Sequence, residues 1–151
     1  MVVVRHPMKI SFSVFIFSIL LIAASGESIS TKFPAVSEAE LLDRFTIAAK
    51  AKDEAAIRSL ICWDGPVVKA PVNRNISDLL SREEITTIRM HPLHPLDHLT
   101  NLLDGSLYYP NIPVIGWIDV HWRLGESAVR FLYGKKKNAF YISCTAEQKL
   151  P

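Results

Sequence analysis

The stretch Ser37–Gly65 constrains the fold of this 151-residue chain most, because it has the pattern of two consecutive amphipathic helices. Ser37 followed by Glu40 is a capping-box signature, in which a hydroxyl and a carboxylate satisfy free amides of the first helical turn. The apolar residues that follow fall on one helical stripe: Leu41, Leu42, Phe45, Ala48 and Ala49. Asp53 then caps a second, shorter helix. The sequence therefore predicts a helical pair that needs another layer of the chain to cover it.

The first 26 residues have the three parts of a secretory signal peptide. Arg5 and Lys9 precede an uncharged apolar run over residues 10–23, and small residues follow it. This run is shorter than the roughly 20 residues of a membrane span. We expect cleavage and export, to the periplasm or outside the cell, with an uncleaved membrane anchor as the alternative. Residues 27–36 then form a flexible lead-in, and residues 37–151 a single domain.

The charge balance argues against nucleic acid as a partner. The chain has 17 Lys and Arg against 15 Asp and Glu, but two of the basic residues, Arg5 and Lys9, lie in the predicted leader. The mature domain is therefore balanced and lacks the positive field that attracts phosphates. Lys135–Lys137 is a local basic cluster, which we interpret as a solvated hairpin tip.

Both cysteines, Cys62 and Cys144, lie in the mature domain. An even number of cysteines in an exported protein permits one disulfide, here between the end of the second helix and the last strand. The alternative is two buried thiols, because free cysteine behaves as a small hydrophobic residue. Neither lies in a metal-binding or CxxC motif.

The middle of the chain contains short patterns of both helix and strand. Val67–Val72 contains Pro71 and predicts an edge strand or a covering loop. Ser77 caps a brief helix that ends near Arg82, and Ile85–Met90 is a β-branched strand. We expect one or two helical turns within residues 96–103 and an irregular link over residues 108–113.

Strand patterns dominate from Val114 onward. Gly116, Ile118, Val120 and Trp122 alternate with Trp117, Asp119, His121 and Arg123, which is the pattern of a half-buried strand. Ala128–Tyr133 is expected to pair with Ala139–Thr145 through the Gly134–Asn138 loop. Helices on one side of an antiparallel sheet define an α+β fold.

This order resembles the nuclear transport factor-like, or cystatin-like (SnoaL-like), α+β superfamily. Phe45–Leu60 is similar to the helix, charged break and second helix of its opening, and Gly116–Thr145 to its closing strands. The resemblance implies a curved antiparallel sheet wrapped around the first helix, a cone-like roll with a pocket. Members include isomerases, cyclases and dehydratases, and non-catalytic ligand-binding or dimerising modules, so the fold does not imply one function.

Asp119, His121 and Arg123 form the sharpest chemical pattern, because residues two apart on a strand share a face. A carboxylate that orients a histidine is the basis of acid–base catalysis, and an arginine could hold an anionic substrate. An ordinary solvent-facing strand has the same pattern. Trp117, on this face, and Tyr108 are the candidate ligand-binding residues.

The histidines His91, His94 and His98, with Asp97, use residue types that bind zinc. Two prolines interrupt them and no HExxH frame is present, so we expect a surface loop without a metal. The sequence indicates no cofactor.

Three functions remain open. We expect a non-catalytic module that binds an unknown small ligand or a protein partner, with a homodimer as one form. The first alternative is a pocket enzyme of the isomerase, cyclase or dehydratase kind, with Asp119 and His121 as its acid–base pair. The second is a structural envelope protein. In each case membrane contact is expected only through an uncleaved leader.

Overall fold

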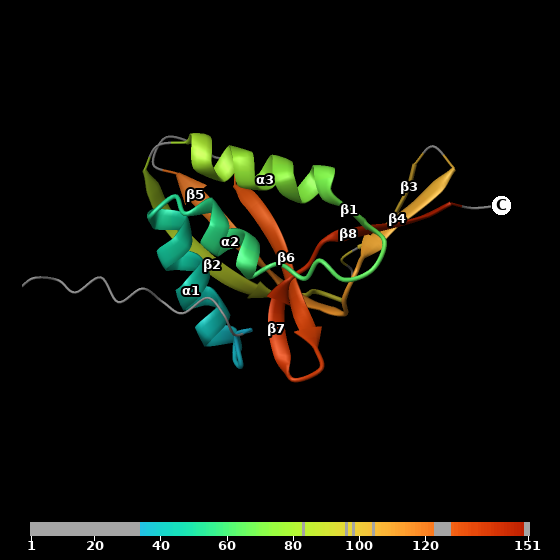
Figure 1. Cartoon of the computed structure of the whole chain (residues 1–151), viewed down its shortest axis with the longest axis horizontal. Helices are drawn as coiled ribbons and strands as arrows, with labels where there is room; N and C mark the ends of the chain where they lie inside the picture. Colours follow the sequence, from blue (N-terminus) through green and yellow to red (C-terminus); the bar gives the residue numbers. More distant parts are fainter. Residues whose placement is uncertain are drawn as a thin grey trace, which may run out of the picture.

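The computed structural model describes residues 34–82, 84–95, 97, 99–103, 105–122 and 128–149. It has the expected α+β fold, with helices packed on curled antiparallel sheets (Figure 1). The helices are α1 (Glu38–Lys50), α2 (Glu54–Ser59) and α3 (Lys69–Ser81). The predicted signal peptide lies outside the described residues, as do residues 27–33 of the predicted lead-in. None of the helices in the described ranges has the length and apolar character needed to span a membrane.

Within the described residues, the strands form two four-stranded sheets. Sheet A has the order β2-β5-β6-β7 and consists of β2 (Ile85–Pro92), β5 (Val114–Trp122), β6 (Val129–Lys136) and β7 (Ala139–Ile142). Sheet B has the order β1-β8-β4-β3 and consists of β1 (Val67–Val68), β8 (Thr145–Lys149), β4 (Ser106–Pro110) and β3 (Asn101–Leu103). Figure 1 shows the helices gathered around sheet A, while β3 and β4 extend from the opposite end, beside the C-terminus.

The predicted caps begin both N-terminal helices. The Ser37 Oγ accepts a hydrogen bond from the Glu40 N–H at 3.1 Å, and the Glu40 Oε2 accepts one from the Val36 N–H at 2.8 Å. The Asp53 Oδ1 accepts a hydrogen bond from the Ala56 N–H at 2.9 Å. Each cap satisfies amides that have no partner within their own helix, so both predicted helix starts are confirmed.

The core lies between α1 and sheet A. The predicted stripe of α1 is buried at Leu41, Phe45, Ala48 and Ala49, and Leu42 is partly buried. Phe45 meets Phe131 of β6 edge-on, with ring centroids 5.2 Å apart. Ile118 and Val120 of β5 belong to the same core. The face of β5 that carries Trp117, Asp119 and His121 is therefore turned away from α1.

The prediction for residues 67–82 was wrong in its boundaries. The strand β1 stops at Val68, and α3 begins at Lys69, eight residues before the predicted Ser77. Pro71 is the third residue of α3, where a backbone N–H has no intrahelical acceptor, so its ring does not break the helix. The buried residues Val72, Ile76 and Leu79 are spaced four and three apart, which is the signature of an amphipathic helix.

Two predictions near residue 105 were also wrong. The predicted helical turns over residues 96–103 give way to strand β3 at Asn101–Leu103, and the first half of the predicted irregular link over residues 108–113 belongs to β4. Strand β4 pairs with β8, placing Tyr109 opposite Ala146. A partner 37 residues away in sequence supplies this pairing, so local pattern alone does not indicate it.

The last predicted strand divides in two. The chain leaves sheet A after Ile142 and enters sheet B at Thr145, with Ser143 and Cys144 between. The Ser143 N–H still donates to the Leu132 carbonyl at 2.8 Å, but β7 pairs with β6 only over Tyr133–Lys136. The two sheets therefore separate at this point, and a fork opens between β6 and β8.

Candidate ligand-binding pocket

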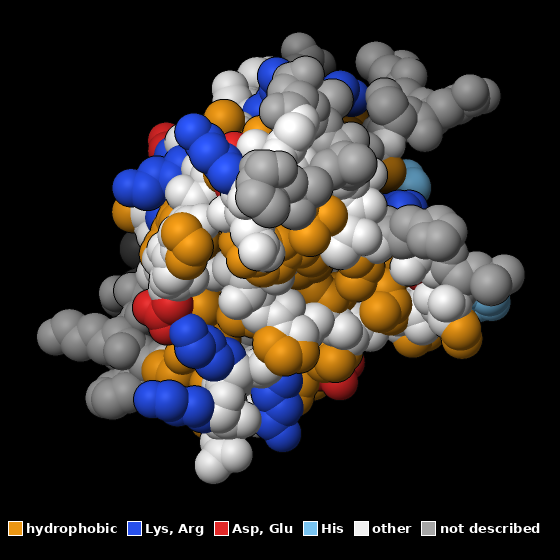
Figure 2. Space-filling model, turned by 90° about the vertical axis from the view of Figure 1, so that its right-hand side faces the viewer, with side chains coloured by type: hydrophobic (Ala, Val, Ile, Leu, Met, Phe, Trp, Pro, Cys, Tyr) orange, Lys and Arg blue, Asp and Glu red, His pale blue; other side chains and the backbone are white. Residues whose placement is uncertain are grey.

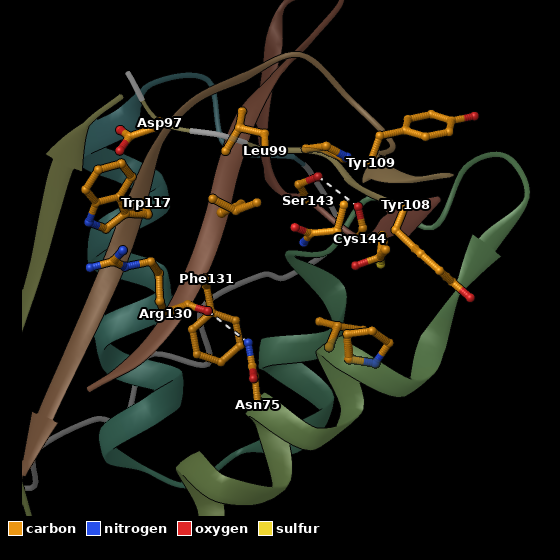
Figure 3. A pocket seen from close by; sticks show the side chains of 16 residues that line it. Asn75, Asp97, Leu99, Tyr108, Tyr109, Trp117, Arg130, Phe131, Ser143 and Cys144 are labelled. Atoms are coloured by element: carbon orange, nitrogen blue, oxygen red, sulfur yellow. Dashed lines mark hydrogen bonds between the residues drawn. The ribbon is translucent and has the colours of Figure 1, made fainter. Parts of the chain in front are cut away.

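A pocket of about 350 Å³ lies at the fork between the two sheets (Figure 3). Its lining comes from α3 through Val72 and Asn75, from β5 and β6 through Trp117 and Arg130–Leu132, and from β4 and β8. Figure 3 shows Trp117 and Arg130 on one side of it, and Tyr108 and Tyr109 on the other. Seen from the end that carries β3 and β4, hydrophobic side chains spread across the middle of the surface, flanked by Lys and Arg (Figure 2).

The pocket brings together the two predicted ligand-binding residues. Trp117 comes from sheet A and Tyr108 from sheet B, and both belong to the lining. The sequence pattern did not indicate their proximity, because β4 was not predicted as a strand. Asn75 and Arg130 also line this pocket without having been predicted. They are recognisable only once α3 lies beside β6.

Trp117 has ring contacts with residues of both neighbouring strands, Arg130 of β6 and His91 of β2. The Arg130 Cζ lies 4.5 Å from the centroid of the Trp117 ring, in a cation–π arrangement. The ring of His91 is stacked at 6.2 Å between centroids, with 27° between the planes. The Trp117 Nε1–H is buried and has no hydrogen-bond partner among the described residues. The indole therefore packs between β2 and β6 as part of the pocket wall.

Asp119 holds Arg130 in that position. The carboxylate, with 10% of its side chain exposed, accepts from the Arg130 Nε at 2.9 Å and from Nη2 at 3.4 Å. The His91 Nε2 lies 3.6 Å from the Asp119 Oδ2. Asp119 lies opposite Arg130 on β6 and Arg89 on β2. This cross-strand register gives the carboxylate its partners.

The predicted catalytic group is only partly assembled. Asp119 and His121 share a face of β5, but no hydrogen bond or ion pair joins them in the described part of the chain, and neither lines the pocket. The histidine nearest to Asp119 is His91, from the neighbouring strand. Arg123 lies outside the described residues. The sequence pattern places His91 in a surface loop, and its position beside Asp119 follows only from the register of β2 against β5.

The open edge of β6 forms the inner side of the pocket. The Asn75 Nδ2 donates to the Arg130 carbonyl at 2.8 Å, and the Ser143 N–H donates to the Leu132 carbonyl at 2.8 Å. These bonds replace the strand that β6 lacks here. Two of its carbonyls are therefore satisfied, one by the Asn75 side chain and one by the backbone N–H of Ser143, which lies opposite Leu132 in the register of β6 and β7.

The two cysteines are free and buried, which is the second of the two predicted alternatives. The Asn111 Nδ2 donates to the Cys62 carbonyl at 2.8 Å, and the Asn111 Oδ1 accepts from the Cys144 N–H at 2.8 Å. Burial, followed by the proximity of Cys62, raises the pKa of the Cys144 thiol to about 11. Cys144 also lines the pocket, so a thiol rather than a thiolate faces it at neutral pH.

The histidine-rich loop is a turn in the structure. The His94 N–H donates to the Asp97 Oδ2 at 2.6 Å, and the Asp97 N–H donates to the His94 carbonyl at 2.9 Å. His98 lies outside the described residues. Within the described ranges, no group of three His, Cys, Asp or Glu side chains is placed to hold a metal ion.

Comparison with known proteins gives no relative from which to assign a function. No family model, curated protein or solved structure matches this chain.

Proposed function

We propose that this protein is a non-catalytic binding module that holds a small, largely apolar ligand in the pocket between β6 and sheet B. One observation carries the proposal: Trp117 and Tyr108, from different sheets, line the same pocket of about 350 Å³. That volume falls within the range of about 300–1,000 Å³ common for ligand sites. Aromatic walls with a few polar groups are the usual composition of such sites. The polar and charged residues in this lining are Asn75, Asp97, Asn101, Arg130, Ser143 and Thr145.

The fixed position of Trp117 supports a binding role. Arg130 of β6 and His91 of β2 both contact the indole ring. A wall that is already ordered loses little conformational entropy when a ligand packs on it. Binding of a ligand then carries no large entropy cost for ordering the Trp117 side chain.

The position of Asp119 favours binding over catalysis. Acid–base catalysis by Asp119 and His121 requires both groups beside the substrate, whereas the pocket lining contains neither. Asp119 is engaged with Arg130 instead. We therefore rank the pocket enzyme below the binding module.

We also infer membership of the nuclear transport factor-like superfamily, and export after removal of a signal peptide. The curled antiparallel sheets with helices packed on them are compatible with the cone-like fold of that superfamily. Export is supported by the leader pattern of residues 1–26.

A fragment screen by ligand-observed NMR tests the binding proposal. The variant Leu99→Trp fills the pocket that Leu99 lines, and Ile47→Trp adds the same side chain on the exposed surface of α1. Fragments that bind the wild-type protein should bind Ile47→Trp equally and lose binding to Leu99→Trp. Equal binding to all three proteins would place the ligand elsewhere and overturn the proposal.

A further inference from the structure

A row of three charged side chains crosses the face of sheet A that is turned away from α1. Arg89 of β2 lies opposite Asp119 of β5, and Asp119 lies opposite Arg130 of β6. Residues that lie opposite each other on antiparallel strands project to the same side of the sheet. The three side chains therefore stand next to one another, on the face that also carries Trp117.

This row carries more positive than negative charge. The Asp119 carboxylate is engaged by Arg130. Arg89 is exposed and forms no hydrogen bond or ion pair with another residue of the described ranges. One carboxylate thus faces two guanidinium groups, and one positive charge in the row has no counter-charge.

Arg130 presents free hydrogen-bond donors to the pocket. A guanidinium has five N–H donors, and Asp119 accepts from one on Nε and one on Nη2. The other three, including both on Nη1, have no acceptor in the described part of the chain. Because Arg130 lines the pocket and 55% of its side chain is exposed, a ligand can reach these donors.

The acidic residue of the pocket lining lies away from this row. Asp97 accepts a hydrogen bond from the His94 N–H through its Oδ2 at 2.6 Å. Figure 3 shows the Asp97 carboxylate and the Arg130 guanidinium at different ends of the Trp117 side chain. An anion beside Arg130 therefore does not lie against the Asp97 carboxylate.

The neighbouring part of the lining is apolar, with Val72, Leu99 and Leu132. Resting on the proposed function of this pocket, we propose that its ligand is an amphipathic monoanion, a carboxylic acid with an apolar body. The body occupies the pocket, the carboxylate accepts from the free donors of Arg130, and Arg89 adds to the positive field. Charge-assisted bonds of this kind are about twice as strong as neutral ones, and a single negative charge matches the excess charge of the row.

Three probes with the same alkyl chain test the charge preference: octanoate, octan-1-ol and octylamine. Their affinities are measured by titration of the ¹⁵N-labelled protein at pH 7. Octanoate should bind at least about fivefold more tightly than octan-1-ol, the effect expected of a partly exposed charge pair. Octylamine should bind more weakly than the alcohol, because its ammonium group is repelled by the row.

Variants of Arg89 test the position of the anion. Arg89→Gln should weaken octanoate binding about threefold and leave octan-1-ol binding unchanged. Arg89→Lys keeps the charge and should bind octanoate nearly as well as the wild-type protein. Arg74→Gln is the matched control, because Arg74 is exposed on α3 outside the pocket lining, and its loss should change neither affinity.

The outcomes separate this inference from the proposed function. If fragments from the screen bind, but octanoate binds no more tightly than octan-1-ol or octylamine, the anionic ligand is overturned and the binding module stands. Equal losses of octanoate affinity in Arg89→Gln and Arg74→Gln would overturn the assignment of the carboxylate to this row. If neither the fragments nor any of the three alkyl probes bind, both proposals fail.

Discussion

The guanidinium of Arg130 covers the ring of Trp117 while it donates two hydrogen bonds to the buried carboxylate of Asp119. One side chain thus links the wall of the pocket to the only buried acidic residue among those described. The integrity of the pocket and the stability of the domain should therefore be coupled at Arg130.

Replacement of Arg130 by alanine should destabilise the domain. It leaves the Asp119 carboxylate without its two nearest donors, and a buried acceptor that loses its partner costs about 1–3 kcal/mol. Because 55% of the Arg130 side chain is exposed, we expect the lower part of that range. Urea unfolding at pH 7 measures the loss.

Lys136→Ala is the matched control for this variant. It removes the Lys136–Asp64 ion pair, which lies on the exposed surface and should contribute much less. Losses of equal size in the two variants would show that the Asp119–Arg130 pair has no special role in stability.

Tyr133 should make the protein sensitive to alkaline pH. Its hydroxyl donates to the Glu38 Oε2 at 2.8 Å, and burial, with Glu38 as the second cause, raises the pKa of Tyr133 to about 12. The unfolded chain releases this proton near pH 10, so the native state binds more protons between pH 10 and 12. Its contribution to stability is complete below pH 10 and is lost as pH rises toward 12.

Comparing the free energy of unfolding of the wild-type protein and of variants across that pH range isolates the contribution of Tyr133. Tyr133→Phe should lose less stability than the wild-type protein between pH 9 and 11.5, whereas Tyr141→Phe should follow the wild type. Parallel curves for Tyr133→Phe and the wild type would contradict the assignment.

The thiols should be present but slow to react. Cys62 and Cys144 are buried, and the raised pKa of Cys144 leaves little thiolate at pH 8. Iodoacetamide should modify the native protein slowly and add two groups once the protein is unfolded. The number of added groups is measured by intact mass in the absence of a reductant. If the unfolded protein adds no group until a reductant is supplied, the two cysteines form a disulfide instead.

Loss of the first helix cap should cost measurable stability. Ser37→Ala removes the acceptor of the Glu40 N–H, and such changes at N-caps cost about 1 kcal/mol. Ser59→Ala is the control, because the Ser59 hydroxyl bonds only to the Ala56 carbonyl within its own helix. Thermal unfolding should show a lower midpoint for Ser37→Ala alone.

Features that depend on one short segment of sequence were predicted correctly. The caps at Ser37 and Asp53 and the stripe of α1 indicated both helices, because capping and amphipathicity are written within one segment. The alternation in β5 indicated a half-buried strand, but which of its faces packs on α1 had been left open. Pro71 misled the assignment of α3, because proline disrupts a helix only beyond its first turn.

The resemblance implied a pocket, but its place and its lining could not be predicted, because they depend on pairing between distant segments. Tyr108 reaches it only through the pairing of β4 with β8, and Arg130 meets Asp119 only through the register of β5 and β6. A one-residue change of register would reverse every side chain on the strand. Trp117 was predicted as a ligand-binding residue from its face alone, without the fork that makes the pocket.

The most direct test of a ligand-binding pocket follows the indole N–H of Trp117 in a ¹H–¹⁵N spectrum during titration with a ligand from the screen. Its signal should shift in a saturable way, whereas that of Trp63, which donates to the Arg58 carbonyl at 3.0 Å and lies outside the pocket, should stay in place. Saturable binding that leaves the Trp117 signal unmoved would contradict the account.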